Sequence, residues 1–372
     1  MSYFKSLRLT DFRSYDTLDL TLDPRPVVLF GPNGAGKTNL LEALSFLSPG
    51  RGLRRAKIEA LARRDKDWTA PAWGVTAQLE INGDMIKLGV GQVPEAPKRR
   101  VLKIDDKSAT GADLARHVKI MWLTPAQDRL FVGPASDRRK FLDRFTMSHT
   151  PEHGLTSLRY EKARAERNRL LSDGITDRGW YEALEKDMAT QSANIALARL
   201  KTVKLIQDDI AAHGTGVFPS AGLELEGTAE NMAASGLSKE DIDFTIRENL
   251  ERERGLDMRA GRTLNGVHRS DLHVRYEAKD MPASACSTGE QKALLIGLTL
   301  AHARAQKAHQ PFLLLDEIAA HLDEDRRAAL IETLLELNHQ VFMTGTDVEL
   351  FEAFSGRAQI FKISDAQATP YT

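Results

Sequence analysis

Hydrophobic and polar residues alternate along most of the first 120 positions of this 372-residue chain. The alternating segments read YFKSLRLTDF, TLDLTL, WGVTAQLEI, MIKLGVG and VLKID. A period of two residues is typical of strands with one buried face, so this part predicts a strand-rich unit. Ile81-Asn82-Gly83-Asp84 separates the third and fourth segments. Asn-Gly accepts the positive φ angles of a tight turn and predicts a β-hairpin there.

The pattern becomes helical after about residue 137 and stays so to residue 212, in a region rich in Ala, Leu, Glu, Lys and Arg. Two long segments, 157–172 and 180–212, flank a break at Ser172-Asp173-Gly174 and predict an antiparallel helical hairpin. Their heptads are too irregular for a long coiled coil. A further helix is expected at 238–254 and a strand at 273–276.

The last hundred residues alternate helices with short, wholly apolar strands, as parallel α/β sheets do. The pattern as a whole therefore predicts an α/β unit, with a mixed sheet flanked by helices, that is split by a helical insertion. The two ends of the chain must then fold together.

Residues 31–38 read GPNGAGKT, which fits the phosphate-binding pattern G-x-x-x-x-G-K-[ST]. An apolar run at 26–30 predicts a strand before the loop, and 39–47 predicts a helix after it, so phosphates would lie at a helix N-terminus. Lys37 is expected to contact the β- and γ-phosphates, and the Thr38 hydroxyl to bind Mg²⁺. The predicted ATP-binding residues of this segment are Gly31, Pro32, Asn33, Gly34, Ala35, Gly36, Lys37, Thr38 and Asn39.

A second apolar strand, PFLLLDE at 311–317, ends in two acids. Asp316 is placed to hold Mg²⁺ together with Thr38, and Glu317 to orient or deprotonate an attacking water. Two solvated acids at a strand end are the alternative, but a phosphate-binding loop in the same chain favours catalysis. Glu317, Lys37 and Asp316 are therefore the predicted catalytic residues.

The formal net charge is −1, so the overall charge gives no reason to expect binding to nucleic acids or membranes. The basic residues are clustered, however, at 51–66 and 98–119. A solvated helix face and a phosphate-binding surface both explain such runs. The DNA-contact candidates of the first run are Arg51, Arg54, Arg55, Lys57, Arg63, Arg64 and Lys66. No zinc-finger or aromatic RNA-binding pattern appears, so base readout is not indicated.

A single cysteine excludes an intramolecular disulfide framework and fits a reducing cytosol. The N-terminal segment has no apolar signal core, and no apolar run is long enough to span a membrane. These features predict a cytoplasmic protein without a membrane partner.

The sequence CSTGEQK at 286–292 opens a long apolar helix. It resembles the signature motif of ABC-type ATPases, which caps the γ-phosphate bound by a second subunit, and Ser287, Thr288, Gly289 and Glu290 are the matching residues. Plain N-capping is the alternative, because Ser287 with Glu290 forms a capping box. Cys286 and Thr288 depart from the usual Leu and Gly of that motif.

Further similarity to ABC-type ATPases follows downstream. IAAHLD at 318–323 resembles the D-loop, and QVFMTGTD at 340–347 resembles the switch strand. Many of these ATPases have a histidine in the switch, whereas this chain has Thr344, Thr346 and Asp347. Gln127 is the one loosely placed candidate for the glutamine loop of transporter-type ATPases.

The chain resembles the RecF family of bacterial recombination mediators, which are related to SMC proteins. The similarity rests on GPNGAGKTNLLEAL, on TPAQDRLFVGPASDRRKFLD at 124–143, on LLLDEIAAHLDEDRRAAL at 313–330 and on GVHRSDL at 266–272. The opening FKSLRLTDFRSYDTLDLTL fits too, with Arg13 expected near the adenine. The resemblance implies an ATPase lobe at 1–122 and 265–372 and a helical lobe with a short helical arm at 123–264.

The same resemblance implies a slow, DNA-stimulated ATPase that serves as a conformational switch in DNA repair, replication restart, recombination and the SOS response. Members dimerise with ATP and Mg²⁺, clamp double-stranded or gapped DNA, and act with RecR and RecO to load RecA. A transporter-type nucleotide-binding subunit is the alternative, which segment 124–143 argues against. A small-molecule kinase would not need the Ser287 motif or the adjacent Asp316-Glu317 pair. Arg138, Arg139 and Lys140 could form a structural ion-pair site between lobes instead of contacting DNA.

Overall fold

The computed structural model describes residues 2–306 and 310–371, which divide into two compact units. The first unit contains the described residues of 1–128, 216–218 and 306–372. The second contains residues 129–215 and 219–305. Residues 265–305, expected in the ATPase lobe, thus belong to the helical unit. The reason is pairing and packing: strand β12 (Asp271–Tyr276) pairs with β11 (Ala221–Glu226), and helix α9 (Thr288–Arg304) packs against α5 (Arg178–His213).

The first unit begins with an antiparallel sheet in the order β2-β1-β6-β7-β8-β9. Its strands are β1 Ser2–Phe12, β2 Tyr15–Thr21, β6 Trp73–Ile81, β7 Asp84–Gln92, β8 Val101–Ile104 and β9 Lys107–Ser108. The alternating segments are thereby confirmed as strands, and β6 and β7 form the expected hairpin, with Ile81 opposite Asp84. Asn82 has φ 52° and Gly83 has φ 97°, the conformation for which Asn-Gly is suited.

The second sheet of this unit has the order β10-β14-β15-β3-β16-β17, and all its neighbours are parallel except β16 and β17. Its strands are β3 Val27–Phe30, β10 Ile120–Leu123, β14 Phe312–Leu315, β15 Val341–Gly345, β16 Gln359–Ser364 and β17 Gln367–Pro370. Strands β3, β10, β14 and β15 are buried at every position, as expected for a covered parallel sheet. Strand β3 lies between β15 and β16, so the N-terminal strand is completed by C-terminal residues.

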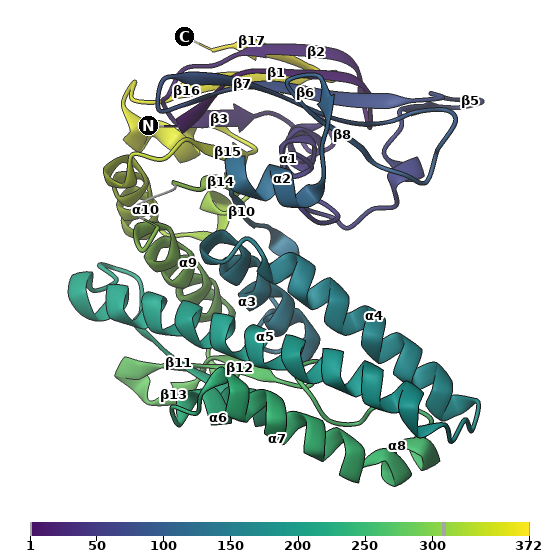
Figure 1. The fold of residues 1–372 in the computed structure, drawn as a ribbon. Helices are drawn as coiled ribbons and strands as arrows, with labels where there is room; N and C mark the ends of the chain where they lie inside the picture. The colour runs from purple at the N-terminus through teal and green to yellow at the C-terminus, as the bar shows by residue number, and fades with distance from the viewer. Residues whose placement is uncertain (1, 307–309, 372) are drawn as a thin grey trace. The chain divides into compact units, whose positions relative to one another are not determined.

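The helices of the first unit cover and connect these sheets (Figure 1). They are α1 Lys37–Ser45, α2 Gly111–His117 and α10 Glu324–Leu337, with short 3₁₀ helices η1 Ile58–Ala60, η2 Pro125–Gln127, η5 Ala319–His321 and η6 Val348–Phe354. One apolar core joins both sheets and α1. Phe4 of β1 is an example, because its ring lies 4.3 Å from Phe312 of β14 and 6.0 Å from Phe342 of β15 between centroids.

The second unit is mainly helical, with one small sheet in the order β11-β12-β13 (β13 is Met281–Pro282). Its other elements are α3 Ala135–His149, α4 His153–Ser172, α6 Thr228–Ala234, α7 Lys239–Arg252, α8 Arg254–Ala260, η3 Glu277–Lys279 and η4 Ala283–Ala285. The predicted helical hairpin is confirmed as α4 and α5, which lie side by side (Figure 1). Strand β11 and helix α6 were not predicted from the sequence.

Charged side chains form part of the interior of the helical unit. Arg167 of α4 is fully buried and donates to Glu185 at 3.1 Å, to Asp257 at 2.7 Å and to the Leu250 carbonyl at 3.0 Å. The two acids are 1% exposed. This cluster therefore joins α4 to α5, α7 and α8 through hydrogen-bonded charges. Removal of Arg167 would leave the buried Asp257 without an ion pair, whereas Glu185 would keep its pair with Arg254.

Candidate nucleotide site

The segment after β3 forms a tight loop whose shape depends on glycine. Gly31, Gly34 and Gly36 have φ angles of 151°, 84° and 109°, which side-chain-bearing residues rarely adopt. At Gly31 a Cβ would also lie 2.2 Å from the carbonyl oxygen of Ile363, and at Gly36 it would lie 2.8 Å from the Tyr15 hydroxyl. Helix α1 starts directly after Gly36, so the loop delivers free backbone N–H groups at a helix N-terminus.

Lys37 begins this helix and directs its side chain back into the loop. Its ammonium donates to the carbonyls of Gly31 at 2.6 Å and Pro32 at 3.0 Å. The side chain is 4% exposed, and burial lowers the pKa of the ammonium, while the acids Glu317 and Asp316 act in the opposite direction. The charge is therefore held inside the loop, where it would meet phosphate oxygens.

The structure brings the loop and the acidic strand end together, as the sequence predicted. The Thr38 hydroxyl donates to Asp316 Oδ1 at 2.9 Å, although the two residues are 278 positions apart. Burial raises the pKa of Asp316, and its hydrogen bonds from Thr344 and Thr38 offset part of this effect. A carboxylate and a hydroxyl are the hard oxygen ligands that Mg²⁺ prefers. Among the described residues no group of three or more His, Cys, Asp or Glu is placed to hold a metal.

Thr344 at the end of β15 connects the two acids, a role that the sequence did not reveal. Its hydroxyl donates to Asp316 Oδ1 at 2.8 Å and accepts the backbone N–H of Glu317 at 2.9 Å. Glu317 has φ 52°, an uncommon conformation for a residue with a side chain. Thr344 thus fixes the carboxylate of Asp316 and the backbone of Glu317.

Two predicted ATP-binding residues are engaged with neighbouring side chains. Arg13 donates to both oxygens of the buried Glu42 at 2.9 Å, and to the Ala60 carbonyl at 3.0 Å. Asn39 donates to Ser14 at 2.9 Å. A contact between Arg13 and adenine therefore stays a prediction, and it would have to be made while the Glu42 pair is kept. Glu42, fully buried on α1, was not singled out from the sequence.

The basic residues predicted to contact DNA differ in their surroundings. Arg54 is tied to Asn39 at 2.8 Å, and Arg63 to Asp11 at 2.9 Å. Four other candidates have exposed side chains that form no ion pair with the described residues, namely Arg51, Arg55, Lys57 and Lys66.

The second basic run comes close to this segment. Arg100 donates to the carbonyls of Ser48 at 3.3 Å and Gly50 at 2.9 Å, so the exposed Lys98 and Arg99 join the same surface of the first unit. Two runs that are separate in the sequence therefore form one cationic surface.

The predicted signature motif lies in the second unit. Ser287 caps α9 through a complete capping box with Glu290, and the Glu290 carboxylate also pairs with Lys279. These contacts lower the pKa of Glu290 to about 2. Thr288 and Gly289 are exposed first-turn residues. The capping alternative is thus confirmed, and a role toward a partner's nucleotide stays a prediction.

Gln127, the candidate for a glutamine loop, accepts the Thr124 N–H at 3.1 Å as part of a similar cap.

Segments 124–143 and 266–272, both important to the resemblance, meet within the second unit. Arg138 forms a two-pronged ion pair with Asp271, with both bonds at 2.7 Å, and Arg139 donates to the Ser270 carbonyl at 2.6 Å. Arg138 and Lys140, which pairs with Asp137 at 3.0 Å, thus form ion pairs inside the second unit. Arg139 donates to a carbonyl instead, and an ion-pair site between lobes stays a prediction.

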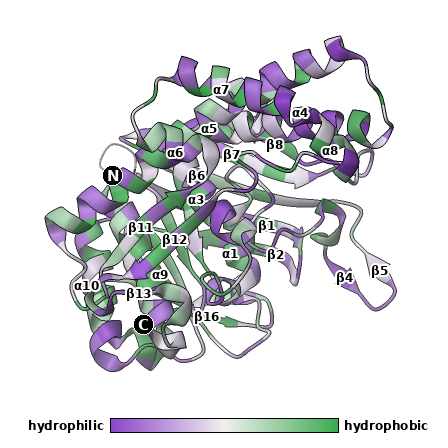
Figure 2. Ribbon diagram, turned by 90° about the horizontal axis from the view of Figure 1, so that it is seen from below, coloured by the Kyte–Doolittle hydropathy of each residue, from purple (hydrophilic) through white to green (hydrophobic). Residues whose placement is uncertain are grey.

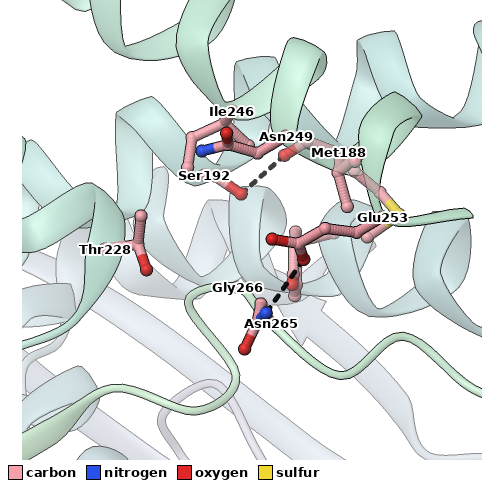
Figure 3. A pocket seen from close by; sticks show the side chains of 10 residues that line it. Met188, Ser192, Thr228, Ile246, Asn249, Glu253, Asn265 and Gly266 are labelled. Carbon is pink, nitrogen blue, oxygen red and sulfur yellow. Dashed lines mark hydrogen bonds between the residues drawn. The ribbon is translucent and has the colours of Figure 1, made fainter. Parts of the chain in front are cut away.

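The helical unit has a cavity of about 50 Å³, lined by residues that include Tyr160, Met188 and Asn249. Figure 3 shows side chains that line it. Two of its polar side chains already have partners, because Ser192 donates to the Met188 carbonyl at 2.7 Å and Asn265 to Glu253 at 2.9 Å. The space admits a few water molecules at most and cannot hold a nucleotide.

Within residues 2–306 and 310–371, no helix is long and apolar enough to cross a membrane.

Comparisons with known proteins agree with this geometry. The family model of the RecF/RecN/SMC N terminal domain matches residues 3–369. The DNA replication and repair protein RecF of Mesorhizobium japonicum is 47% identical over 99% of this chain and 98% of its own length. Its counterpart in Rhizobium meliloti is 46% identical, with the same coverage. Such end-to-end similarity to repair proteins does not favour a transporter subunit.

Solved structures show the same fold. A structure described as the recombination mediator protein RecF-ATPrS in the RecFOR pathway has a TM-score of 0.84 at 21% identity, covering 100% of this chain and 98% of that one. An Smc head domain from Pyrococcus furiosus, bound to the C-terminal domain of ScpA, has a TM-score of 0.57 at 16% identity, covering 100% and 96%. Because the family model and the relatives span almost every residue, the chain belongs to the RecF family of ABC-type ATPases.

Proposed function

We propose that this protein is an ATP-dependent recombination mediator of the RecF type, acting in the cytoplasm on DNA under repair. The observation that carries the proposal is the Thr38–Asp316 hydrogen bond of 2.9 Å. It joins a phosphate-binding loop to the acid that ABC-type ATPases require for Mg²⁺. The names of relatives near 47% identity support the repair context.

In the proposed reaction Lys37 and the loop N–H groups bind the phosphates, and Thr38 and Asp316 would hold Mg²⁺. The ion, when bound, neutralises charge on the phosphates. Glu317 orients and deprotonates the attacking water, and its backbone is held in place by Thr344.

The nucleotide site is tested with Lys37→Ala and Glu317→Gln. Lys37→Ala should abolish ATP binding, because it removes the buried charge. Glu317→Gln should bind ATP normally but hydrolyse it at least about a hundredfold more slowly, in the range expected when acid–base catalysis is removed. The controls Lys107→Ala and Glu349→Gln alter exposed side chains and should change neither property. Hydrolysis at the wild-type rate by Glu317→Gln would exclude Glu317 as the catalytic base.

We further propose an ATP-dependent homodimer in which Ser287 of one subunit completes the site built around Lys37 of the other. Ser287→Arg should prevent dimerisation, measured by sedimentation, while monomers still bind ATP. Mixing inactive Lys37→Ala with inactive Ser287→Arg should restore activity, since a mixed dimer has one site without either change. ATP hydrolysis by dilute, monomeric Ser287→Arg protein would refute the shared site.

The partners that the proposal includes are double-stranded or gapped DNA and, by family, RecR, RecO and RecA. The cationic surface formed by 51–57 and 98–100 supports DNA binding through phosphates. Reversal of Arg51, Arg55 and Lys57 to Glu should weaken duplex binding equally for all sequences. It should also reduce the slope of log affinity against log salt by about 0.9 for each phosphate that the protein no longer neutralises. Reversal of the exposed Lys5, Lys239 and Lys362 is the matched control, and an unchanged slope in the triple variant would place the DNA elsewhere.

A further inference from the structure

A large aromatic side chain is exposed on a small hairpin of the first unit. Strands β4 (Arg64–Asp65) and β5 (Trp68–Thr69) form a two-residue ladder closed by Lys66 and Asp67, and Trp68 is 46% exposed. In both ribbon views the hairpin extends away from β1 and β2 of the same unit (Figures 1 and 2). Trp68 is absent from the apolar core of this unit, so its exposed ring needs another explanation.

The hairpin is anchored at its base and presents the ring in a fixed position. The residues that flank it, Ala62 and Ala70, are buried, and the Ala70 N–H donates to the Arg63 carbonyl at 2.9 Å. The Arg63 guanidinium lies 4.8 Å from the centroid of the Trp68 ring. Arg63 itself is held by Asp11 at 2.9 Å. The tryptophan is therefore supported by a cation that is fixed from the core sheet.

Charged residues of both signs surround the exposed ring. Lys66 lies in the turn at the tip and Arg64 at the base of the ladder, opposite Thr69. Both are exposed, and neither forms an ion pair with the described residues. Arg64 also donates to the Glu59 carbonyl at 3.5 Å, which connects the hairpin to the segment that follows the loop 51–57. Asp65 stands opposite Trp68 in the ladder and accepts the Lys66 N–H at 2.8 Å, and Asp67 is the other nearby acid. An exposed aromatic ring with cations on the same hairpin is an arrangement that can bind unpaired nucleotides.

We propose that Trp68 stacks on an unpaired base of the DNA, so that the hairpin at 63–69 recognises a gap or a single-stranded end beside the bound duplex. This inference rests on the proposed DNA-binding function and adds a residue that distinguishes DNA structures. Bases inside a duplex are already stacked on both faces, whereas a base at an interruption has a free face for the ring. A protein partner could also cover a tryptophan, but the unpaired cations beside it favour a polyanion.

The test compares three variants of Trp68 on three DNA molecules: a blunt duplex, the same duplex with a gap, and a single strand. Trp68→Ala should lose at least about fivefold in affinity for the gapped and single-stranded DNA, the lower end of the effect of removing one stacked base. Its affinity for the blunt duplex should change less than about twofold. Trp68→Phe should keep most of the gap preference, whereas Trp68→Leu should lose it, because leucine is apolar but has no aromatic face.

Trp180→Ala is the matched control, since Trp180 is 64% exposed in the second unit. It should change none of the affinities. If Trp68→Ala lowers the melting midpoint, the comparison of Phe with Leu carries the test, because both side chains are large and apolar. Equal losses on all three DNA molecules, or a Leu variant that behaves as wild type, would refute base stacking.

The outcomes also separate this inference from the proposed function. Wild-type protein that binds no DNA with ATP would refute both. Wild-type protein that binds DNA, with a gap preference unaffected by Trp68→Ala, would refute the stacking role alone and leave the hairpin as a surface for a protein.

Discussion

Asp316 is a buried carboxylate whose charge the protein stabilises only in part. It is 5% exposed, and its two side-chain hydrogen bonds, from Thr38 and Thr344, both end on Oδ1. Burial of such an ion costs several kcal/mol even after relaxation. Two hydroxyl hydrogen bonds offset about 1.5–3 kcal/mol each. The raised pKa of Asp316 shows that the balance still disfavours the charge.

We therefore expect Asp316→Asn to stabilise the nucleotide-free protein while it abolishes Mg²⁺-dependent hydrolysis. The amide oxygen can accept both hydroxyl hydrogen bonds, and the buried charge disappears. A gain of about 1–2 kcal/mol is expected, which raises the melting midpoint by about 2–8 °C for a unit of this size. The measurement is thermal unfolding without nucleotide, followed by ATP alone and by ATP with Mg²⁺. Only the wild type should be stabilised further by Mg²⁺.

The pH dependence provides a second test of the same reasoning. A carboxyl group with a raised pKa in the folded state stabilises the fold when protonated, and this stability is lost as the pH rises from 3.8 through the folded pKa. The advantage of Asp316→Asn should thus be full at neutral pH and shrink as the pH falls toward 3.8. Asp347→Asn removes the same charge from an exposed position and should give no gain. A lower melting midpoint for Asp316→Asn at pH 7.5 would refute the argument.

Three other changes test separate parts of the molecule. Gly31→Ala should destabilise the protein by about 3 kcal/mol and abolish ATP binding, because its Cβ would lie 2.2 Å from the Ile363 oxygen; Gly34→Ala, with open space around it, should cost only about 1 kcal/mol. Arg167→Leu should cost about 3–5 kcal/mol in denaturant unfolding, because the buried Asp257 loses its ion pair and Glu185 keeps only its pair with Arg254; a change below 1 kcal/mol would contradict that account. Burial lowers the pKa of His339 to about 4, so stability should fall as the pH drops from 6.5 toward 4, by up to about 3 kcal/mol. His339→Gln should flatten this slope in unfolding measured at several pH values, and an unchanged slope would exclude His339 as its source.

The parts of the fold that the sequence predicted have local signals. Alternation identified the antiparallel strands, and apolar length identified β3 and β14. The Asn82-Gly83 pair located a hairpin through its own backbone preference. The boundary of the second unit could not be found in this way, because the pairing of β12 with β11 depends on contacts between distant residues. Strand β11 alternates apolar and polar residues, but it is only six residues long, and its alternation does not identify the strand with which it pairs.

The residues of the candidate site also differ in whether local sequence reveals their role. The loop at 31–38 and the pair Asp316-Glu317 are motifs in which the chemistry of phosphate and Mg²⁺ binding requires each residue type at its position. The structure brings the two motifs together. Thr344 and Glu42 were missed because their roles come from tertiary contacts with Asp316 and Arg13. Threonine at a strand end is too common to carry a signal, and a glutamate on a helix is normally exposed.

The position of β3 has a consequence for the synthesis of the protein. Its two neighbours in the sheet, β15 and β16, begin at residues 341 and 359. A ribosome that adds about 5–20 residues per second finishes β15 roughly 15–60 s after β3 has been made. During that time the four apolar residues of β3 lack both of their hydrogen-bonding partners. The phosphate-binding loop is among the first segments translated, yet it cannot be assembled until the last strands emerge, so a nascent chain cannot bind ATP prematurely and depends on protection from aggregation while it waits.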